Sequence, residues 1–252
     1  MISIIMAAYN AENTIKSSIE SVISQTYEDW ELIIVDDCSK DSTQEIVKAY
    51  AEKDMRIHLY ANERNIGASS TRNNGIARAV GEWIAILDSD DIWHMEKLEI
   101  QVSFMESIGA VISYTGTTYI SKEGTTSDYV LRAKQRLTYS ELLRRNLMSC
   151  SSVMVRRDVM KPFPVGNMHE DYAVWLKILK EHDFAHGLDE PLLIYRMAGD
   201  SKSGKRLASA KMIYNTYRHV GYNWFWAALL TLRYSIHSIS KRAMIKRMFK
   251  SG

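Results

Sequence analysis

The sequence predicts an α/β fold in which a mostly parallel central sheet is flanked by helices. Along the first 100 residues, short apolar runs alternate with segments whose apolar residues recur at helical spacing, as in parallel strands joined by helices. The chain has 252 residues, 46% hydrophobic and 25% charged, so it is globular and long enough for one substantial core. Its two cysteines, Cys38 and Cys150, exclude a disulfide framework and a CxxC zinc site and favour a reducing compartment.

Four apolar runs in the first half predict strands that are covered by helices on both faces. Ile15, Ile19 and Val22 share one face of a helix predicted between the first two runs. A second helix begins at a capping sequence near Ser42, and a third begins at Gly67 and runs to about residue 80. The four predicted strands are residues 2–8, 30–35, 56–60 and 83–87.

The second half has a less regular pattern. Leu98, Val102 and Met105 predict one helix, and the acidic pair Glu170-Asp171 suits the start of another. Residues 117–137 are polar and rich in Thr, which is typical of a hairpin or a mobile loop. Strands are predicted at residues 110–114, 151–155 and 192–195.

The C-terminal segment is strongly basic. Residues 201–252 contain eleven Lys or Arg and no Asp or Glu, whereas residues 1–200 carry a net charge of −9. A basic helix with one apolar face suits the interface of an anionic membrane; the alternatives are a helix packed on the body and a dimer contact. No recognised nucleic-acid module surrounds these cations, so nucleic acid is not an expected partner. The predicted apolar face is Phe225, Leu229, Leu232, Ile236 and Ile239.

No targeting or membrane-spanning segment is expected. Met1 is followed at once by apolar residues, with no basic region and no cleavage site of the kind that ends a signal peptide. The longest apolar stretch, residues 224–232, is far shorter than the roughly 20 residues that a spanning helix needs. These features predict a cytoplasmic protein that lies peripherally at the inner face of the membrane.

Polar and mostly acidic residues follow three of the predicted strands. They would meet at one edge of the sheet, where open α/β sheets bind their ligands. Carboxylates that crowd together repel unless a cation offsets them, and Mg²⁺ or Mn²⁺ prefers oxygen ligands and often binds substrate phosphates as well. The pattern therefore predicts a metal–diphosphate site. The strand ends are Tyr9-Asn10, Asp36-Asp37 and Asp88-Ser89-Asp90-Asp91.

Two common phosphate-binding motifs are absent. No GxxxxGK[ST] loop is present, which argues against a P-loop ATPase, and no GxGxxG follows the first strand, which argues against a dinucleotide dehydrogenase. A sugar-nucleotide pyrophosphorylase would show a Gly-rich, basic loop after that strand, where this chain has Ala-Ala-Tyr-Asn.

Six segments, taken in order, resemble the signatures of family-two inverting glycosyltransferases with the GT-A fold. The resemblance covers about residues 1–200 and is closest to bacterial enzymes of surface polysaccharide synthesis, such as those of teichuronic acid, O-antigen or capsule. It implies a Rossmann-like sheet. The segments are Ile4-Ile5-Met6-Ala7-Ala8-Tyr9-Asn10; Ser24-Gln25-Thr26-Tyr27; Val35-Asp36-Asp37-Cys38-Ser39-Lys40-Asp41-Ser42-Thr43; Asn65-Ile66-Gly67 with Thr71-Arg72-Asn73-Asn74-Gly75; Leu87-Asp88-Ser89-Asp90-Asp91; and Glu170-Asp171-Tyr172.

The resemblance implies a nucleotide site built from the strand ends. Tyr9 would stack on the base, and Asp37 would accept a hydrogen bond from uracil N–H. Ala7 would contribute its backbone, and Arg72 would reach the nucleotide or its phosphates. The residue types alone also permit Tyr9 as a core or edge tyrosine and Arg72 as a helix-surface cation.

The resemblance also assigns the chemistry. Asp88 would bind ribose or assist the metal, and Asp90 would bind Mn²⁺ or Mg²⁺ directly, stabilising the diphosphate that leaves. Asp171 would be the general base that deprotonates the acceptor hydroxyl, so one displacement inverts the anomeric centre. Glu170 is the rival base, and a helix-capping acid is the plainer interpretation of Asp171.

Further contacts with the diphosphate or the acceptor are expected near the acids and after the last strand. Trp93 would stack on an acceptor sugar or pack under the loop. Relatives often carry a histidine soon after the position of Arg196, but this chain continues Met197-Ala198-Gly199-Asp200-Ser201. Arg196 and Lys202, with Lys205, would contact the diphosphate instead, on a loop that orders over the bound donor.

The prediction is therefore a hexosyltransferase with a UDP-hexose donor and a saccharide acceptor on a polyprenyl diphosphate. Residues 1–205 would form the catalytic domain, with a nucleotide-binding half (1–100) and an acceptor-binding half (101–205), and residues 206–252 a helical tail. The alternative is a binding protein without turnover; the presence of Asp37, Asp88, Asp90 and Asp171 weighs against it.

Overall fold

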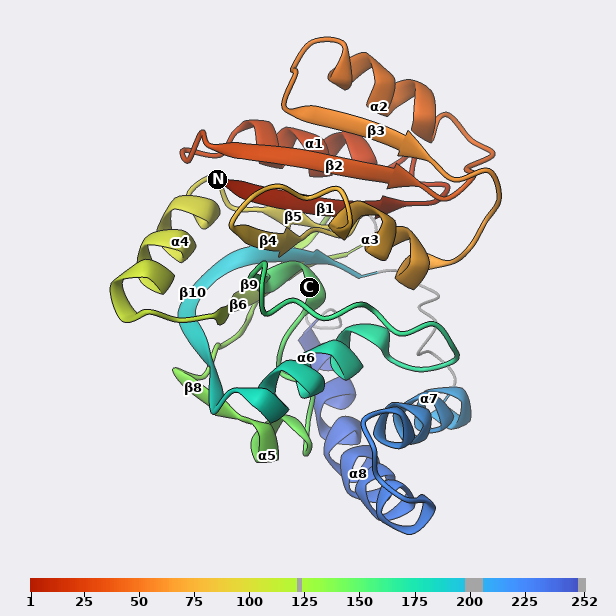
Figure 1. Cartoon of the computed structure of the whole chain (residues 1–252). Helices are drawn as coiled ribbons and strands as arrows, with labels where there is room; N and C mark the ends of the chain where they lie inside the picture. Colours follow the sequence, from red (N-terminus) through yellow and green to blue (C-terminus); the bar gives the residue numbers. More distant parts are fainter. Residues whose placement is uncertain (122–123, 198–205, 249–252) are drawn as a thin grey trace.

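The computed structural model describes residues 1–121, 124–197 and 206–248. Lys202 and Lys205 lie outside the described residues, as does the side chain of Ile239. The described strands form one ten-stranded sheet whose main path runs β3-β2-β1-β4-β9-β6-β10-β5, with β7 and β8 paired at its side (Figure 1). Both halves of the predicted catalytic domain therefore share a single sheet.

The first half of the sheet is parallel, as predicted. Strand β1 pairs in parallel with β2 and β4, and β2 pairs in parallel with β3. The helices between these strands occur where the apolar spacing predicts them, except that α3 ends at Ile76 rather than near residue 80. Val80 lies in an exposed connection. The elements are β1 (Ile2–Ala8), α1 (Ile15–Ile23), β2 (Trp30–Asp36), α2 (Thr43–Ala51), β3 (Ile57–Ala61), α3 (Ala68–Ile76) and β4 (Trp83–Ile86).

The second half of the sheet is mixed rather than mostly parallel. Strand β9 runs antiparallel to both β4 and β6, and β10 runs parallel to β6. Strand β9 is antiparallel to both of its neighbours, so β6 runs in the same direction as β4. The carboxyl ends of β6 and β10 therefore lie at the same edge as those of β1 to β4. The elements are β5 (Ile92–Trp93), α4 (Lys97–Ile108), β6 (Ile112–Ile120), β7 (Thr126–Leu131), β8 (Arg136–Thr138), α5 (Tyr139–Leu142), the 3₁₀ turn η1 (Cys150–Ser152), β9 (Val153–Arg156), α6 (Glu170–Glu181) and β10 (Phe184–Arg196).

Two apolar cores cover the two faces of the sheet. One packs α1, α2 and α4 against the alternate β1 side chains Ile2, Ile4 and Met6, and the other packs α3 and α6 against the opposite side, including Ile5. Helix α3 lies close to β1 because residue 75 is glycine: a Cβ there would lie 2.8 Å from Cγ2 of Ile5. The Gly of the Thr-Arg-Asn-Asn-Gly segment is thus a packing residue.

Two helices follow the last strand, α7 (Arg206–His219) and α8 (Trp224–Met248). The sequence predicts a helical tail over residues 206–252 without dividing it into two helices. Helix α7 packs in the same core as α6 through Ile213 and Tyr217. In Figure 1 both helices lie at the lower right, away from α1 and α2 at the top. Among the described residues, no helix is both long enough and apolar enough to cross a bilayer.

A buried lysine stands beneath the acidic loop. Lys97 is fully buried, donates from Nζ to Oε1 of Gln101 at 2.7 Å, and lies 4.1 Å from the centre of the Trp93 ring. No carboxylate within the described ranges forms an ion pair with it. Burial lowers the pKa of Lys97 to about 7.

Replacing Lys97 by Met is expected to raise the free energy of unfolding by on the order of 2 kcal/mol at pH 7, because a buried cation without a counter-charge opposes folding. The unfolded chain keeps the lysine proton up to about pH 10, whereas the folded protein loses it near 7. The wild type should therefore gain stability from this group as the pH rises from 7 to 9, and Lys97→Met should not. Urea unfolding at the two pH values measures both effects; equal pH dependence of the two proteins would contradict the expectation.

Candidate functional site

The predicted strand ends do meet at one edge of the sheet. Tyr9 follows β1, Asp37 follows β2, the acidic loop 88–91 follows β4, and Arg196 ends β10. The turns after β1 and β2 are unusual, since Asn10 and Cys38 have φ angles of 49° and 63°, in the left-handed region. The two turns are tied together, because the Asn10 N–H donates to Oγ of Ser39 and the Lys40 N–H donates to Oδ1 of Asn10.

Asp37 is the carboxylate that β2 presents at this edge. Oδ1 accepts hydrogen bonds from Nδ2 of Asn62 and N of Ile66, each at 2.9 Å, and Oδ2 accepts from N of Gly67 at 2.8 Å. Burial acts to raise the pKa of Asp37, but these hydrogen bonds outweigh it and lower the pKa. Asp37 is thus held ionised by its hydrogen-bond donors, which include the Thr71 side chain.

Asp36, one residue earlier, has a different role. It is fully buried, and its carboxylate accepts from the Ser39 backbone and hydroxyl and from Nε2 of Gln44 at 2.6 Å. These contacts hold the turn that presents Asp37. The sequence places both acids at the strand end, and only the packing distinguishes them.

Arg72 joins the two halves of the site. Its guanidinium donates to Oδ1 of Asp88 at 2.6 Å and lies 3.5 Å from Oε1 of Glu170. The side chain is 9% exposed, and its Nε has no acceptor among the described residues. Arg72 therefore orients Asp88, after β4, relative to the start of α6. It is not the helix-surface cation that the residue type alone permits.

The acidic loop after β4 contains carboxylates whose ionised form is disfavoured by burial. Burial and the neighbouring charge of Asp88 raise the pKa of Asp90 to about 6, against the weaker opposing charges of Arg196 and Arg72. Asp88 is committed to Arg72 through one oxygen. Such a pair of neighbouring carboxylates is a place where an added cation is favoured.

Asp171, in the first turn of α6, shares this environment. Burial raises its pKa, and the charge of Glu170 adds to that rise. The same charges act on Cys150, whose buried thiol has its pKa raised by burial and by the charges of Asp88 and Asp171, against that of Arg72. The charges of Asp171, Asp88 and Arg72 therefore all act on one buried side chain, although Asp171 lies 80 residues beyond the end of the acidic loop in the sequence.

The remaining predicted residues occupy different positions. Tyr9 is 50% exposed at the edge, and Ala7 lies within β1 opposite Val35. Trp93 is 2% exposed and donates from Nε1 to the Ser151 carbonyl at 2.7 Å, so packing under the loop, one of its two expected roles, describes its place here. Arg196 reaches the acidic loop through its Nε, which lies 3.0 Å from the Asp90 carbonyl oxygen.

Several residues of the site are not found by sequence reasoning. Asn62 holds Asp37, and Asn73 exchanges two hydrogen bonds of 2.8 Å with the backbone of Phe163, in the segment that leads to α6. Cys150 and Ser151 come from η1, which has no local signal of function. Asn73 lies inside a recognisable motif, so its importance was detectable but its role was not.

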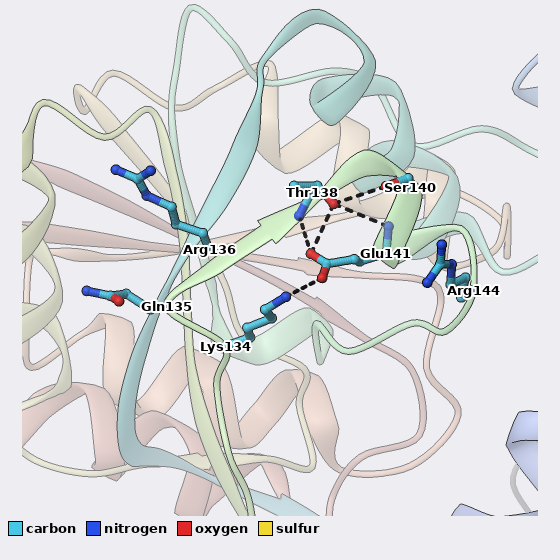
Figure 2. Close-up of a pocket in the computed structure, with 7 residues that line it drawn as sticks. All are labelled: Lys134, Gln135, Arg136, Thr138, Ser140, Glu141 and Arg144. Carbon is cyan, nitrogen blue, oxygen red and sulfur yellow. Dashed lines mark hydrogen bonds and ion pairs between the residues drawn. The ribbon is translucent and has the colours of Figure 1, made fainter.

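Hollows lie beside the start of α6 and elsewhere on the described part of the chain. One, of about 430 Å³, lies between the start of α3, the loop before α6 and α7; Gly67, Ser69, Glu170 and Met212 are among its lining residues. Another, of about 490 Å³, lies on β8 and α5, where Lys134 pairs with Glu141 and Thr138 caps α5 (Figure 2). None of the predicted site residues lines this second hollow.

The donor set for a metal is small. In the described part of the chain no group of three or more His, Cys, Asp or Glu side chains is arranged to hold a metal ion. Asp90 and Asp88 supply oxygen ligands of the kind that Mg²⁺ and Mn²⁺ prefer. These residues fit a cation that takes its other ligands from phosphate oxygens and water.

The sheet thus places the Asp-x-Asp loop at the end of β4 beside the acids that begin α6, with Arg72 between them. The chain belongs to glycosyl transferase family 2, whose family description matches residues 3–162. It is 36% identical to TuaG of Bacillus subtilis (strain 168), a teichuronic acid biosynthesis glycosyltransferase, over 96% of this chain and 97% of that one. It is 41% identical to WfgD of Escherichia coli over 73% of this chain and 72% of that one. WfgD is named as a UDP-Glc:alpha-D-GlcNAc-diphosphoundecaprenol beta-1,3-glucosyltransferase.

Solved structures confirm the fold. S. aureus TarS (residues 1–349) in complex with UDP-GlcNAc superposes with a TM-score of 0.73 at 19% identity, over 92% of this chain and 71% of that one. The mannosyltransferase PcManGT from Pyrobaculum calidifontis, in complex with GDP-Man and Mn²⁺, superposes with a TM-score of 0.68 at 16% identity, over 96% and 75%. The chain is thus a glycosyltransferase with the α/β fold of GT-A enzymes.

Proposed function

We propose that the protein is an inverting, metal-dependent hexosyltransferase of bacterial surface polysaccharide synthesis. Its donor is a UDP-hexose, and its acceptor is a sugar on a polyprenyl diphosphate. The observation that carries the proposal is the convergence of Asp37, Asp88, Asp90 and Asp171 at one edge of the sheet. The names of TuaG and WfgD support a polysaccharide product, and that of WfgD supports the donor and acceptor classes.

The donor would bind along the strand ends. Asp37, which is held ionised, would accept a hydrogen bond from the uracil N–H, and half-exposed Tyr9 offers its ring to the base. Asp88, oriented by Arg72, faces the ribose or the metal. Asp90 and Asp88 would hold Mn²⁺ or Mg²⁺, which supplies positive charge to offset the charge that develops on the departing diphosphate. Arg196 and Lys202 would add cationic contacts to the same phosphates; Lys202 lies outside the described residues.

The acceptor would be activated by Asp171. A general base works best when its pKa lies closer to the working pH, and burial and the charge of Glu170 move the pKa of Asp171 in that direction. Glu170 is a weaker candidate because it is paired with Arg72 at 3.5 Å. Removal of the hydroxyl proton by Asp171 permits one direct displacement at the anomeric carbon, which inverts it.

Turnover with defined substrates tests the proposal. UDP release is measured from UDP-glucose, UDP-galactose and their N-acetyl forms, with and without Mn²⁺, in the presence of a GlcNAc-diphospho-polyprenyl acceptor. We expect acceptor-dependent release that Mn²⁺ increases, followed by linkage analysis of the product. Binding of a UDP-sugar without any release would favour the alternative of a binding protein without turnover.

The tail supports a peripheral position at an anionic membrane. Helix α8 packs on the body through Ala227, Leu230 and Tyr234, and its other side exposes a stripe of large apolar residues. No acidic residue occurs beyond position 200, so the cations near this stripe favour an anionic surface. The exposed stripe is Trp224 (68% exposed), Phe225 (54%), Trp226 (51%), Leu229 (47%), Leu232 (62%) and Ile236 (61%).

Helix α7 and one side of α8 pack on the body, as in the alternative to membrane contact. The exposed stripe of α8 is not covered by this packing and is available to lipid. It includes four of the five residues of the predicted apolar face; the side chain of the fifth, Ile239, is outside the described residues. A donor site and a membrane-facing helix in one short chain would bring UDP-sugar and a lipid-linked acceptor together, in keeping with a cytoplasmic enzyme at the inner leaflet.

Replacing Leu229, Leu232 and Ile236 together by Ser should lower binding to phosphatidylglycerol vesicles by roughly 100-fold, since each buried apolar side chain contributes about 1 kcal/mol or more at an interface. Vesicle flotation measures the change. Met55→Ser with Val80→Ser is the matched control, because both residues are exposed and lie far from α8 in sequence. Undiminished flotation of the triple variant would contradict the membrane role, and a loss of self-association in gel filtration instead would indicate a dimer contact.

A further inference from the structure

One buried acid in the acidic loop has no part in the mechanism above. Asp91 is 1% exposed and follows the predicted metal ligand Asp90 directly. A carboxylate buried to this degree is costly unless both of its oxygens have hydrogen-bond donors. The hydrogen bonds of Asp91 therefore indicate its structural role.

Asp91 joins three segments that are distant in the sequence. Its Oδ2 accepts from the Ser151 hydroxyl at 2.6 Å, and its Oδ1 accepts from the Arg196 backbone N–H at 3.0 Å. The Ser151 hydroxyl in turn accepts from the Asp88 backbone N–H at 3.0 Å. The acidic loop is thus fastened to η1 on one side and to the end of β10 on the other.

A return contact closes the arrangement. Nε of Arg196 donates to the carbonyl oxygen of Asp90 at 3.0 Å, so Arg196 binds the loop through both its backbone and its side chain. Trp93 reinforces the η1 side through its bond to the Ser151 carbonyl. We call Asp91, Ser151 and Arg196 the clasp.

The clasp fixes the backbone on both sides of Asp90. The N–H of Asp88 and the carbonyl of Asp90 are both held, so the residues that carry the two candidate metal ligands have little freedom to turn. The same contacts place Arg196, at the end of β10, against the acidic loop. Preorganised ligands of this kind are what a charged leaving group requires.

We propose that Asp91 is a positioning residue that, through Ser151 and Arg196, sets the direction of the Asp88 and Asp90 carboxylates for the cation and the diphosphate. This inference rests on the proposed function and deepens it. Asp91 acts through the clasp and does not touch the substrate. The clasp needs an acceptor at both oxygens, which a carboxylate provides and an amide does not.

The test compares two neighbouring buried serines. Both are fully buried, but the Ser152 hydroxyl donates to the Ser149 carbonyl at 2.7 Å and takes no part in the clasp, so Ser152→Ala is a matched control for Ser151→Ala. UDP affinity is measured calorimetrically with and without Mn²⁺ for the wild type and each variant. Asp91→Asn is the second variant that alters the clasp. The UDP affinity without metal shows whether each variant is folded and keeps the site for the base.

We expect Mn²⁺ to strengthen UDP binding in the wild type and in Ser152→Ala. In Ser151→Ala and Asp91→Asn that enhancement should fall by about tenfold, while metal-free UDP affinity stays within twofold, a split that a merely structural role would not produce. An equal Mn²⁺ effect in Ser151→Ala and Ser152→Ala would overturn the clasp and leave the proposed function intact. A wild type that binds no UDP would overturn the proposed function, and one that binds UDP without any Mn²⁺ effect would overturn the metal assignment and the clasp with it.

Discussion

Replacing Asp171 by Asn should lower kcat for transfer by roughly 10³-fold, because general-base catalysis contributes about 10² to 10⁴ to such reactions. The amide cannot take the proton from the acceptor hydroxyl. UDP affinity should change little, since the proposed nucleotide site lies at Asp37 and the other strand ends rather than on α6. Steady-state kinetics with the acceptor varied, and UDP titration of the same variant, separate the two effects.

The pH profile gives a second check on the same residue. Burial and the charge of Glu170 raise the pKa of Asp171, and the base works only when deprotonated. Activity should therefore fall as the pH drops through that raised pKa, and this acid limb should be missing from Asp171→Asn.

Glu170→Gln is the comparison that decides between the two acids. Glu170 stands next in sequence, but it is bound to Arg72, and its substitution should cost far less activity than that of Asp171. If Asp171→Asn kept full transfer while Glu170→Gln lost it, the assignment of the base would be reversed.

The first half of the fold is predictable because its strands are buried on both faces. Residues 2–8 are almost wholly apolar and match β1, whereas the last strand begins at Phe184, well before the predicted residue 192. The middle of β10 contains Asp189, Glu190 and Pro191, which lie exposed where its pairing with β6 shifts register. An apolar run cannot indicate such a strand. The predicted helical tail is not resolved into a separate helix α7 for a related reason, since the buried Thr216 interrupts the apolar pattern there.

The acidic residues of the site can be predicted from the sequence, but the residues that bind them cannot. Strand ends bring Asp37 and the loop 88–91 to one edge by topology alone. The sequence could not tell that Asp36 is committed to its own turn, or that Ser151 arrives from η1, more than 50 residues further on. Such contacts depend on how distant segments pack, and no local pattern records them. The roles of the predicted residues stay predictions until they are measured.

The metal assignment depends most directly on Asp90. Replacing Asp90 by Asn should remove the Mn²⁺ stimulation of transfer and lower kcat by roughly 100-fold or more, because the charge on the departing diphosphate would lose its cation. Metal-free UDP affinity should persist through Asp37. Asp88→Asn should also disturb Arg72, whose strongest ion pair is the 2.6 Å contact to Asp88, so its effect would combine ligand loss with a displaced guanidinium.

The pH dependence of metal binding follows from the same carboxylate. Burial and the charge of Asp88 raise the pKa of Asp90 to about 6, so protons compete with the cation below that pH. The apparent affinity for Mn²⁺, measured by titration in the presence of UDP, should fall by up to about tenfold per pH unit below 6 and level off above it. An affinity that is flat between pH 5 and 7, or one unchanged in Asp90→Asn, would mean that the cation is held elsewhere. In that case Arg196 and Arg72 would be the positive charges left to offset the diphosphate.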